Sequence, residues 1–394
     1  MGNGKLLRPF GVMIDGRVER GLEIQLDEAG RITHIGPQSG MPNLNILSPA
    51  FVNAHSHLEY RGMLGQITGG DFFSFLRQIT ALKPEESPDY IEAMCLRAAQ
   101  ENFNTGVAMI GEHTDRPGSA KAMKQVGLLG MLFQEAITSN ARGEEQEKLE
   151  FVAEKARGAY AESHLPTHVN PHAAYTVDPN SLRFLAEQNT PASIHCAEHT
   201  IENDFIARGE GAIADFRREQ GVDVKPLGRS VVAFLNELGF LRPTTQLVHC
   251  CDLDDEDISL IAKSGSSIAH CPRSNTFLHC KPARIREFLT AGITVGLGMD
   301  SPATGDHIDF FAEMRAALQT SRERGKPVTA EEIWQMATTW GAKSLGTPNW
   351  EIKVGNRIPL IEIDVELALE TEDILERGTP EAVNWILTSS EAVS

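Results

Sequence analysis

The sequence predicts an α/β fold, a (β/α)8 barrel of the TIM type, with a small β-sandwich domain formed by the two ends of the chain. Three observations predict it: eight apolar, β-rich runs end in polar or histidine residues, helix-like segments alternate with these runs, and both termini carry short strand patterns instead. The expected boundaries are residues 1–48 and 350–394 for the two parts of the sandwich and residues 49–349 for the barrel.

The eight runs lie between residues 46 and 304 and predict eight strands. They cover residues 46–57, 105–114, 129–137, 167–177, 192–200, 245–253, 266–275 and 293–304. Between them, apolar residues at three- and four-residue spacing predict helices over 88–104, 144–163, 179–189, 228–240, 255–265 and 283–292. The alternation indicates a parallel sheet, and eight strands are the number of a closed barrel. The rival, a doubly wound open sheet, would place a glycine-rich phosphate turn after an early strand, and "NAHSHLEYRG" is not such a turn.

The two ends of the chain have a different pattern. Short strands with turns are predicted over residues 11–18 and 21–36, and again over 355–367 and 381–389. Strands from both ends could pair into one small β module. The acidic segment 367–382 is predicted to be a solvated loop or a short helix.

The composition bounds the class of function. The chain is 41% apolar and 23% charged, which is typical of a globular protein. Its formal charge of −18 repels nucleic acid polymers and anionic membrane surfaces, so we expect a small-molecule substrate, with no nucleic acid or membrane partner. No apolar stretch has the length of a signal peptide core or a membrane span, and we expect a cytoplasmic protein. The oligomeric state stays open, with a homodimer among the options.

Polar residues fall at the ends of the predicted strands, where barrel enzymes assemble their active sites. His55 and His57 are two residues apart, so on a strand both side chains point to the same face and can share one metal ion. With His195 and Asp300, which close the fifth and eighth runs, they would form a site of three nitrogens and one oxygen that leaves a position for water. Each residue alone has a simpler role, but their joint position favours the metal site.

The stretch "SIHCAEHT", residues 193–200, has two interpretations. On a helix, His195, Glu198 and His199 spell the H-x-x-E-H signature of a zinc peptidase. On a strand, only His195 is a metal ligand, and Glu198 is left to carry a proton. The preceding "TPASI", with a proline and a β-branched residue, disfavours the helix.

Six motifs follow one another along the chain, and both their order and their spacing are informative: "PAFVNAHSHLEYRG", "NPHAAYTV", "HCAE", "LVHCCDL", "HCPRSN" and "GLGMDS". Together they resemble the amidohydrolase superfamily, and more narrowly its mononuclear metal-dependent deaminase and chlorohydrolase branch, which includes adenosine-type, aminofutalosine, guanine and s-triazine enzymes. The resemblance covers most of the chain. It implies one divalent cofactor ion, Zn²⁺ with Fe²⁺ as the alternative, bound by His55, His57, His195 and Asp300.

The resemblance also implies roles in catalysis. Zinc would lower the pKa of a bound water, Asp300 would orient or deprotonate that water, and Glu198 would carry a proton to a ring nitrogen. His249 would polarise the attacked centre, and His172 would contact the substrate. Ammonia would then leave.

Further substrate contacts are expected in the loops at the barrel mouth. Arg61, Arg273 and Asn275 are candidates, each weighed equally against a solvated or helix-capping role. The aromatic tract 72–76 would either wall an apolar pocket or pack as an ordinary helix, and its spacing slightly favours packing. The role of His270 is left open.

One metal ion is favoured over two. Binuclear members usually bridge two ions with a modified lysine on the fourth strand, and no lysine occurs between Lys155 and Lys225. A second ion on Glu112 or His113 remains an alternative. Cys196 and Cys250 neighbour site histidines on strands, so they should face away from the site as core thiols.

The expected function is that of a hydrolase of non-peptide carbon–nitrogen bonds, a cyclic amidine deaminase. Its expected substrate is purine nucleoside-like, such as aminofutalosine or an adenosine derivative. An s-triazine chlorohydrolase or aminohydrolase is the enzymatic alternative. A zinc peptidase and a non-catalytic barrel are disfavoured, the second because every expected ligand is present.

Overall fold

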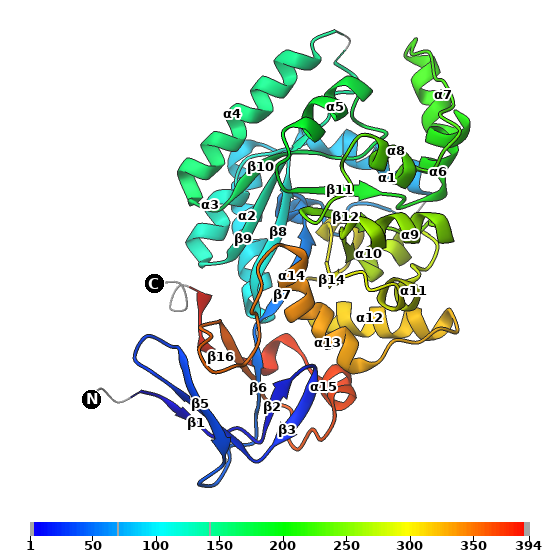
Figure 1. Ribbon diagram of the computed structural model, residues 1–394. Coiled ribbons are helices and arrows are strands. Elements are labelled where there is room, and N and C mark those ends of the chain that lie inside the picture. The colour runs from blue at the N-terminus through cyan, green and yellow to red at the C-terminus, as the bar shows by residue number, and fades with distance from the viewer. Residues whose placement is uncertain (1–3, 69–70, 142, 390–394) are drawn as a thin grey trace.

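The computed structural model describes residues 4–68, 71–141 and 143–389, and within them all eight predicted inner strands form. They make two parallel sheets of four strands (Figure 1). The first sheet has the order β10-β9-β8-β7 and the second β11-β12-β13-β14. Their bounds are β7 Phe51–Ser56, β8 Val107–Thr114, β9 Leu129–Ala136, β10 Thr167–Pro171, β11 Ala192–Cys196, β12 Thr245–His249, β13 Ser267–His270 and β14 Val295–Leu297.

The two parallel sheets touch at both pairs of edges. A parallel bridge joins Ser56, at the end of β7, to Asp300 after β14, and a second joins Ala173 to His195. The Asp300 N–H donates to the His55 carbonyl at 2.9 Å, and the His195 N–H donates to the His172 carbonyl at 3.0 Å. These contacts bring the carboxyl ends of the first and last strands together.

Helices connect successive strands, as the periodicity predicts. The connecting helices are α2 Pro88–Asn104, α3 Ser119–Val126, α4 Glu145–Ser163, α5 Pro179–Glu187, α8 Val231–Glu237, α9 Asp255–Ser264 and α11 Ile285–Thr290. Insertions at the strand ends add α1 Phe72–Leu82, α6 Thr200–Asn203, α7 Gly211–Glu219 and α10 Pro272–Phe277. Three helices lie between the last inner strand and β15: α12 Phe310–Glu323, α13 Ala330–Ala337 and α14 Thr339–Ser344. None of the helices in the described part of the chain combines the length and the apolar character needed to cross a membrane.

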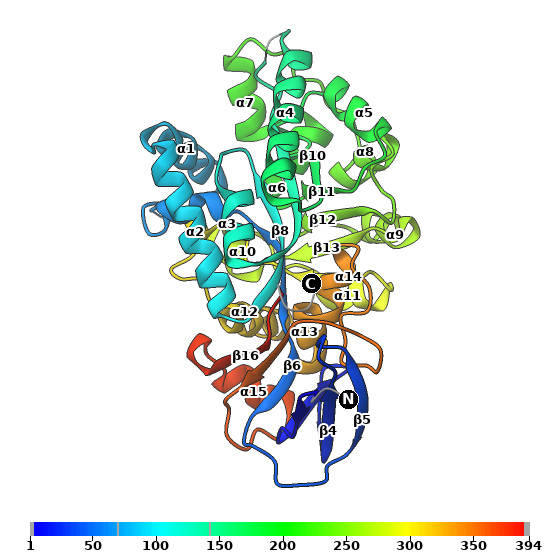
Figure 2. The same ribbon diagram turned by 90° about the vertical axis from the view of Figure 1, so that its left-hand side faces the viewer.

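Strands from both ends of the chain pair with each other, as predicted. One sheet has the order β16-β15-β6-β2-β3 and a smaller one the order β1-β4-β5. Both views place these strands together at one end of the molecule (Figure 2). Their bounds are β1 Leu6–Leu7, β2 Gly11–Ile14, β3 Arg17–Arg20, β4 Leu22–Leu26, β5 Ile32–Pro37, β6 Ile46–Pro49, β15 Leu360–Ile363 and β16 Val383–Leu387. Within the acidic segment, helix α15 (Thr371–Arg377) buries Ile374 and Leu375, so the short helix is the correct alternative.

The first predicted run, residues 46–57, divides into two strands. Its first half, β6, pairs with β2 and β15 of the terminal sheet, and its second half, β7, enters the parallel sheet. The Phe51 ring then packs at 5.3 to 5.5 Å from the rings of Phe310, Phe311 and Trp334. This buried aromatic cluster fixes β7 against α12 and α13, and thereby sets the position of the two histidines that follow.

Candidate active site

A cavity of about 590 Å³ lies where the inner strands end. Six of the residues selected from the sequence line it: His57, His172, His195, Glu198, His249 and Asp300. Helices α1 and α7 contribute the main apolar part of its lining, with Phe72, Phe73, Phe75, Leu76, Ile79, Ile213 and Phe216. A volume of this size suits a small organic molecule.

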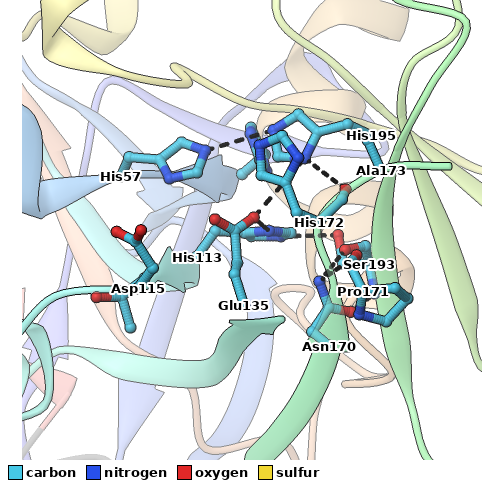
Figure 3. Close-up of polar contacts among 12 residues, drawn as sticks. His57, His113, Asp115, Glu135, Asn170, Pro171, His172, Ala173, Ser193 and His195 are labelled. Carbon is cyan, nitrogen blue, oxygen red and sulfur yellow. Dashed lines mark hydrogen bonds and ion pairs between the residues drawn. The ribbon is translucent and has the colours of Figure 1, made fainter. Parts of the chain in front are cut away.

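Four donor groups meet at one end of this cavity. One ligand atom each of His55, His57, His195 and Asp300 lies within 4.8 Å of the others, and all four residues are buried. The Nε2 atoms of His57 and His195 lie 3.4 Å apart (Figure 3), and His55 Nε2 lies 3.2 Å from Asp300 Oδ1. The structure therefore brings together the four predicted metal ligands.

The charge states of these groups suit a divalent ion. Burial, reinforced by neighbouring histidines, holds the pKa values of His57 and His195 well below their usual range, so both imidazoles are neutral. Burial opposes ionisation of Asp300, but the hydrogen bond from His55 and the nearby imidazoles keep its pKa well below the ordinary value. Neutral imidazoles with one carboxylate are the donor set of catalytic zinc sites, so the residues fit such an ion.

Hydrogen bonds behind the donor set orient its members. His195 Nδ1 lies 3.0 Å from the His172 carbonyl oxygen, so it donates there and leaves Nε2 free to face the cluster. The Ser274 hydroxyl donates to Asp300 Oδ2 and leaves the Oδ1 atom toward the histidines. In metal sites, hydrogen bonds of this kind hold the ligand side chains in the orientation that binds the ion.

The backbone turns sharply at the strand ends that carry these groups. Ala197, His249 and Asp300 have φ values of 49°, 70° and 59°, in the left-handed region that residues with a side chain rarely adopt. Such conformations persist where the surrounding structure enforces them, and they gather at functional sites. These three residues end or follow β11, β12 and β14, and Cys250, directly after β12, shares the conformation with a φ of 53°.

Glu198 and His249 face each other beside the donor set. Glu198 Oε1 lies 3.6 Å from His249 Nε2, and both residues are buried. Burial raises the pKa of Glu198 well above its ordinary value and so favours the protonated form of this carboxyl group. Burial also lowers the pKa of His249 to about 4, so its imidazole is neutral. A proton donor and a neutral imidazole thus stand at the cavity wall, as acid–base chemistry requires.

The peptidase interpretation of "SIHCAEHT" is wrong for this structure. His195 belongs to strand β11, and the next helix, α6, begins only at Thr200. His199 is the N-cap of α6, and its ring stacks on Phe72 at 5.2 Å. His195 and His199 therefore do not lie one turn apart on a helix.

Among the four predicted substrate contacts, His172 lines the cavity and the other three have internal partners. Arg61 forms a two-pronged ion pair with Glu101, with contacts of 2.5 and 2.8 Å. Arg273 pairs with Asp306 and also donates to the His307 carbonyl at 3.0 Å. Asn275 contacts His249 behind the cavity wall. Those three side chains are absent from the lining of the large cavity among the described residues.

The residues considered for a second ion have other contacts. Glu112 Oε1 accepts hydrogen bonds from the Leu58 N–H and the Ser119 hydroxyl at 2.9 and 2.7 Å. His113 contacts Glu135 through Nδ1 at 3.2 Å and Ser193 through Nε2 at 2.9 Å (Figure 3). His113 and Glu135 lie close enough to His195 to form a second donor group, but both ring nitrogens of His113 already have protein partners.

The sequence left two roles open for the aromatic tract 72–76 and slightly favoured helix packing. The structure shows both, because the tract begins helix α1 and Phe72, Phe73 and Phe75 line the cavity. Three further lining residues, Tyr60, Tyr175 and Arg217, were not predicted. Tyr60 and Tyr175 each stand a few residues beyond a quoted motif histidine, and Arg217 belongs to an inserted helix. Cys196 and Cys250 are fully buried in the main apolar core, as expected for core thiols.

Known proteins resemble this chain in sequence and in fold. A 5-methylthioadenosine/S-adenosylhomocysteine deaminase of Natronomonas pharaonis is 29% identical over 335 residues, which cover 82% of this chain and 73% of the relative. A 5'-deoxyadenosine deaminase of Methanoregula boonei is 29% identical over 380 residues, 92% of this chain and 81% of the relative.

Solved structures share the fold at lower identity. A zinc-bound adenosine deaminase from Xanthomonas campestris superposes with a TM-score of 0.80 at 22% identity, covering 98% of this chain and 93% of its own. Helicobacter pylori aminofutalosine deaminase gives 0.81 at 18% identity, covering 96% and 100%. The model of the amidohydrolase family matches residues 46–380. Since that match spans both parallel sheets and the whole donor set, the chain belongs to the amidohydrolase family.

Proposed function

We propose that this protein is a metal-dependent deaminase of a purine nucleoside-like compound, either an adenosine derivative altered at its 5' position or aminofutalosine. One observation carries the proposal: a buried set of three imidazoles and one carboxylate opens onto the same cavity as Glu198 and His249. The relatives named as deaminases of 5'-modified adenosines support the substrate class.

His55, His57, His195 and Asp300 would hold one divalent ion, Zn²⁺ in the proposal and Fe²⁺ as the alternative. When bound, such an ion lowers the pKa of water and makes it a nucleophile at neutral pH. Asp300, which is ionised, accepts a proton as water adds to the carbon that bears the amino group. His249 lines the same cavity beside Glu198 and Asp300, and the Nε2 atom of its neutral imidazole would accept a hydrogen bond from the adding water, in place of the polarising role first expected.

Glu198 would act on the leaving side of the reaction. Burial favours the protonated form of its carboxyl group, which can give its proton to the ring nitrogen of the heterocycle, so that negative charge does not build up on the ring. The proton taken up by Asp300 would then pass to the amino group, which leaves as ammonia, and the hydroxyl proton would return to Glu198. A carbonyl group is left on the carbon that carried the amine, and both carboxyl groups regain their starting states. Water is consumed and ammonia is released, one of each per turnover.

The apolar wall of the cavity suits the rest of such a substrate. The rings of Phe72, Phe73 and Phe216 offer flat contacts to a planar base and to an uncharged sugar substituent. His172 stands beside His195, with ring centroids 4.5 Å apart, where it would contact the base or the ribose. The proposed substrate is a small molecule, and the charge of −18 supports the absence of a nucleic acid polymer or an anionic membrane as partner. A cytoplasmic location is also part of the proposal.

We further propose that the eight inner strands close into one barrel over residues 49–349 and that the two terminal sheets form a β-sandwich from residues 1–48 and 350–394. The bridges Ser56 to Asp300 and Ala173 to His195 support closure. The pairing of β6 with β15 supports a terminal domain that uses both chain ends.

The test is product release by the purified protein loaded with one metal ion per chain. The substrate panel comprises adenosine, 5'-deoxyadenosine, 5-methylthioadenosine, S-adenosylhomocysteine, aminofutalosine, guanine and a chlorinated s-triazine. We expect ammonia from one or more of the adenosine-type compounds. Chloride from the triazine without ammonia from the others would favour a chlorohydrolase, and no product from any compound would refute the proposal.

A further inference from the structure

The peptide between His195 and Glu198 is held in an uncommon conformation. Ala197 follows strand β11 with a φ of 49°, so the chain reverses there and brings Glu198 back to the cavity wall. A residue with a side chain adopts this conformation only when its surroundings enforce it.

Glu202 holds this peptide from one side. Its carboxylate Oε1 accepts a hydrogen bond from the Glu198 N–H at 2.9 Å, and Oε2 accepts one from the Ala197 N–H at 3.2 Å. From the other side, the N–H groups of Cys251 and Asp252 both donate to the Ala197 carbonyl at 2.9 Å. The turn is thus held on both sides, and Glu202 is the side chain that holds it.

The burial of the Glu202 carboxylate is energetically unfavourable. Glu202 is fully buried, and within the described residues no lysine or arginine forms an ion pair with it. Burial of an unpaired carboxylate is unfavourable and raises the pKa of Glu202 to about 7, against the stabilising effect of the two backbone N–H groups. A neutral side chain would avoid that cost, but it would offer fewer acceptor oxygens to the turn.

We propose that Glu202 is a positioning residue for the acid–base group of the reaction: by accepting both N–H groups, it fixes the peptide that carries Glu198. Glu202 itself does not belong to the residues that line the cavity in the described structure, so it acts through Glu198. The inference rests on the proposed function for its effect on turnover, but the clamp on the turn exists independently of any substrate.

Glu202→Gln tests the clamp with the smallest change in shape. An amide offers only one acceptor oxygen, so one of the two N–H groups would face an NH₂ group instead. Asp257→Asn is the matched control, because Asp257 is also buried and accepts hydrogen bonds from the Asp254 N–H and the Ser230 hydroxyl, away from the cavity. The control reports the general effect of neutralising a buried, hydrogen-bonded carboxylate.

The first measurement is amide hydrogen exchange of a peptide spanning residues 193–203. We expect Glu202→Gln to speed exchange in this segment and Asp257→Asn to leave it unchanged. Unchanged exchange in Glu202→Gln would overturn the inference, whatever the activity of the protein. This readout stays informative even if the wild-type protein releases no ammonia, a result that would refute the proposed function alone.

The second measurement is a double-mutant cycle on ammonia release. We expect Glu202→Gln to lower kcat by about tenfold while KM changes by less than about threefold and metal content stays constant. In a Glu198→Gln background, Glu202→Gln should lower kcat by less than about twofold, because the glutamine at position 198 has no carboxyl proton to transfer. An equal loss in both backgrounds, or a kcat no lower than that of Asp257→Asn, would show that Glu202 does not position Glu198.

Discussion

His249 Nδ1 lies 2.8 Å from Asn275 Oδ1, in the buried layer behind the cavity wall. With the amide oxygen as the acceptor, Nδ1 carries the proton and Nε2 presents a lone pair. That Nε2 atom has no hydrogen-bond partner in the described part of the structure and lies 3.6 Å from Glu198 Oε1. Asn275, which the sequence placed among the substrate contacts, therefore orients His249.

Asn275→Leu should lower kcat by about tenfold, because His249 loses the partner that fixes its ring and its tautomer. Asn275→Asp keeps an acceptor oxygen in the same place and should retain more activity than the leucine variant. The measurement is kcat and KM at constant metal content. A rise in KM alone would instead support the original expectation of a substrate contact.

His195→Ala and Glu198→Gln should separate metal binding from proton transfer. The first removes one of four donors, so metal content measured on the purified protein should fall well below one ion per chain. The second leaves the donor set intact, so metal content should persist while turnover falls about a hundredfold or more. Full metal content and activity in His195→Ala would refute the assigned site.

The strands and the donor set could be predicted because their signals are local. The two-residue spacing of His55 and His57 fixes both on one face of a strand, and the position of His195 and Asp300 after apolar runs fixes their end of the sheet. In a barrel, the carboxyl ends of all strands lie on one face, so the four donors were expected to meet there. The bridges Ser56 to Asp300 and Ala173 to His195 agree with that arrangement.

The partners of charged side chains could not be predicted in the same way. Arg61 pairs with Glu101, forty residues away, and nothing in the sequence near either residue indicates the other. The role of Glu202 depends on a turn whose shape comes from hydrogen bonds with residues 251 and 252. Contacts of this kind arise from packing between elements, which sequence periodicity does not describe.

Arg61→Gln tests whether Arg61 stabilises the fold or contacts the substrate. The Arg61–Glu101 pair is partly buried and two-pronged, so its loss should lower the free energy of unfolding by about 1 kcal/mol. KM should stay within about twofold of the wild-type value, since Arg61 does not line the cavity. A large rise in KM with unchanged stability would restore Arg61 as a substrate contact.

Arg217→Met should weaken substrate binding more than it slows chemistry. The Arg217 guanidinium donates to the carbonyls of Ser139 and Tyr175 at 3.2 and 2.9 Å, and so ties helix α7 to the loops after β9 and β10. Without it, the apolar wall on α7 loses its support. KM should rise by about tenfold, and kcat should change by less than about threefold.

Arg218→Met is the matched control for that variant. Arg218 is the next residue on α7, but its side chain is half exposed and pairs with Asp215 on the same helix. Its removal should leave KM unchanged. Equal effects of the two variants on KM would argue against a specific role of Arg217.

Glu287→Gln should give a stability deficit that depends on pH. Burial opposes ionisation, but hydrogen bonds from Arg324 and Lys326 hold the pKa of Glu287 at about 2, below its ordinary value of 4.5. A lowered pKa means that the carboxylate stabilises the fold above about pH 4.5 and that this stabilisation is lost as the pH falls through about 2. At pH 7 the variant should be less stable by about 1 kcal/mol. The deficit in the free energy of unfolding, measured by urea titration at a series of pH values, should shrink as the pH is lowered.

Glu154→Gln, at an exposed position in the middle of α4, should show no deficit at any pH. A deficit of constant size from pH 7 to pH 3 would mean that the glutamine variant loses packing, with no contribution from the charge of Glu287.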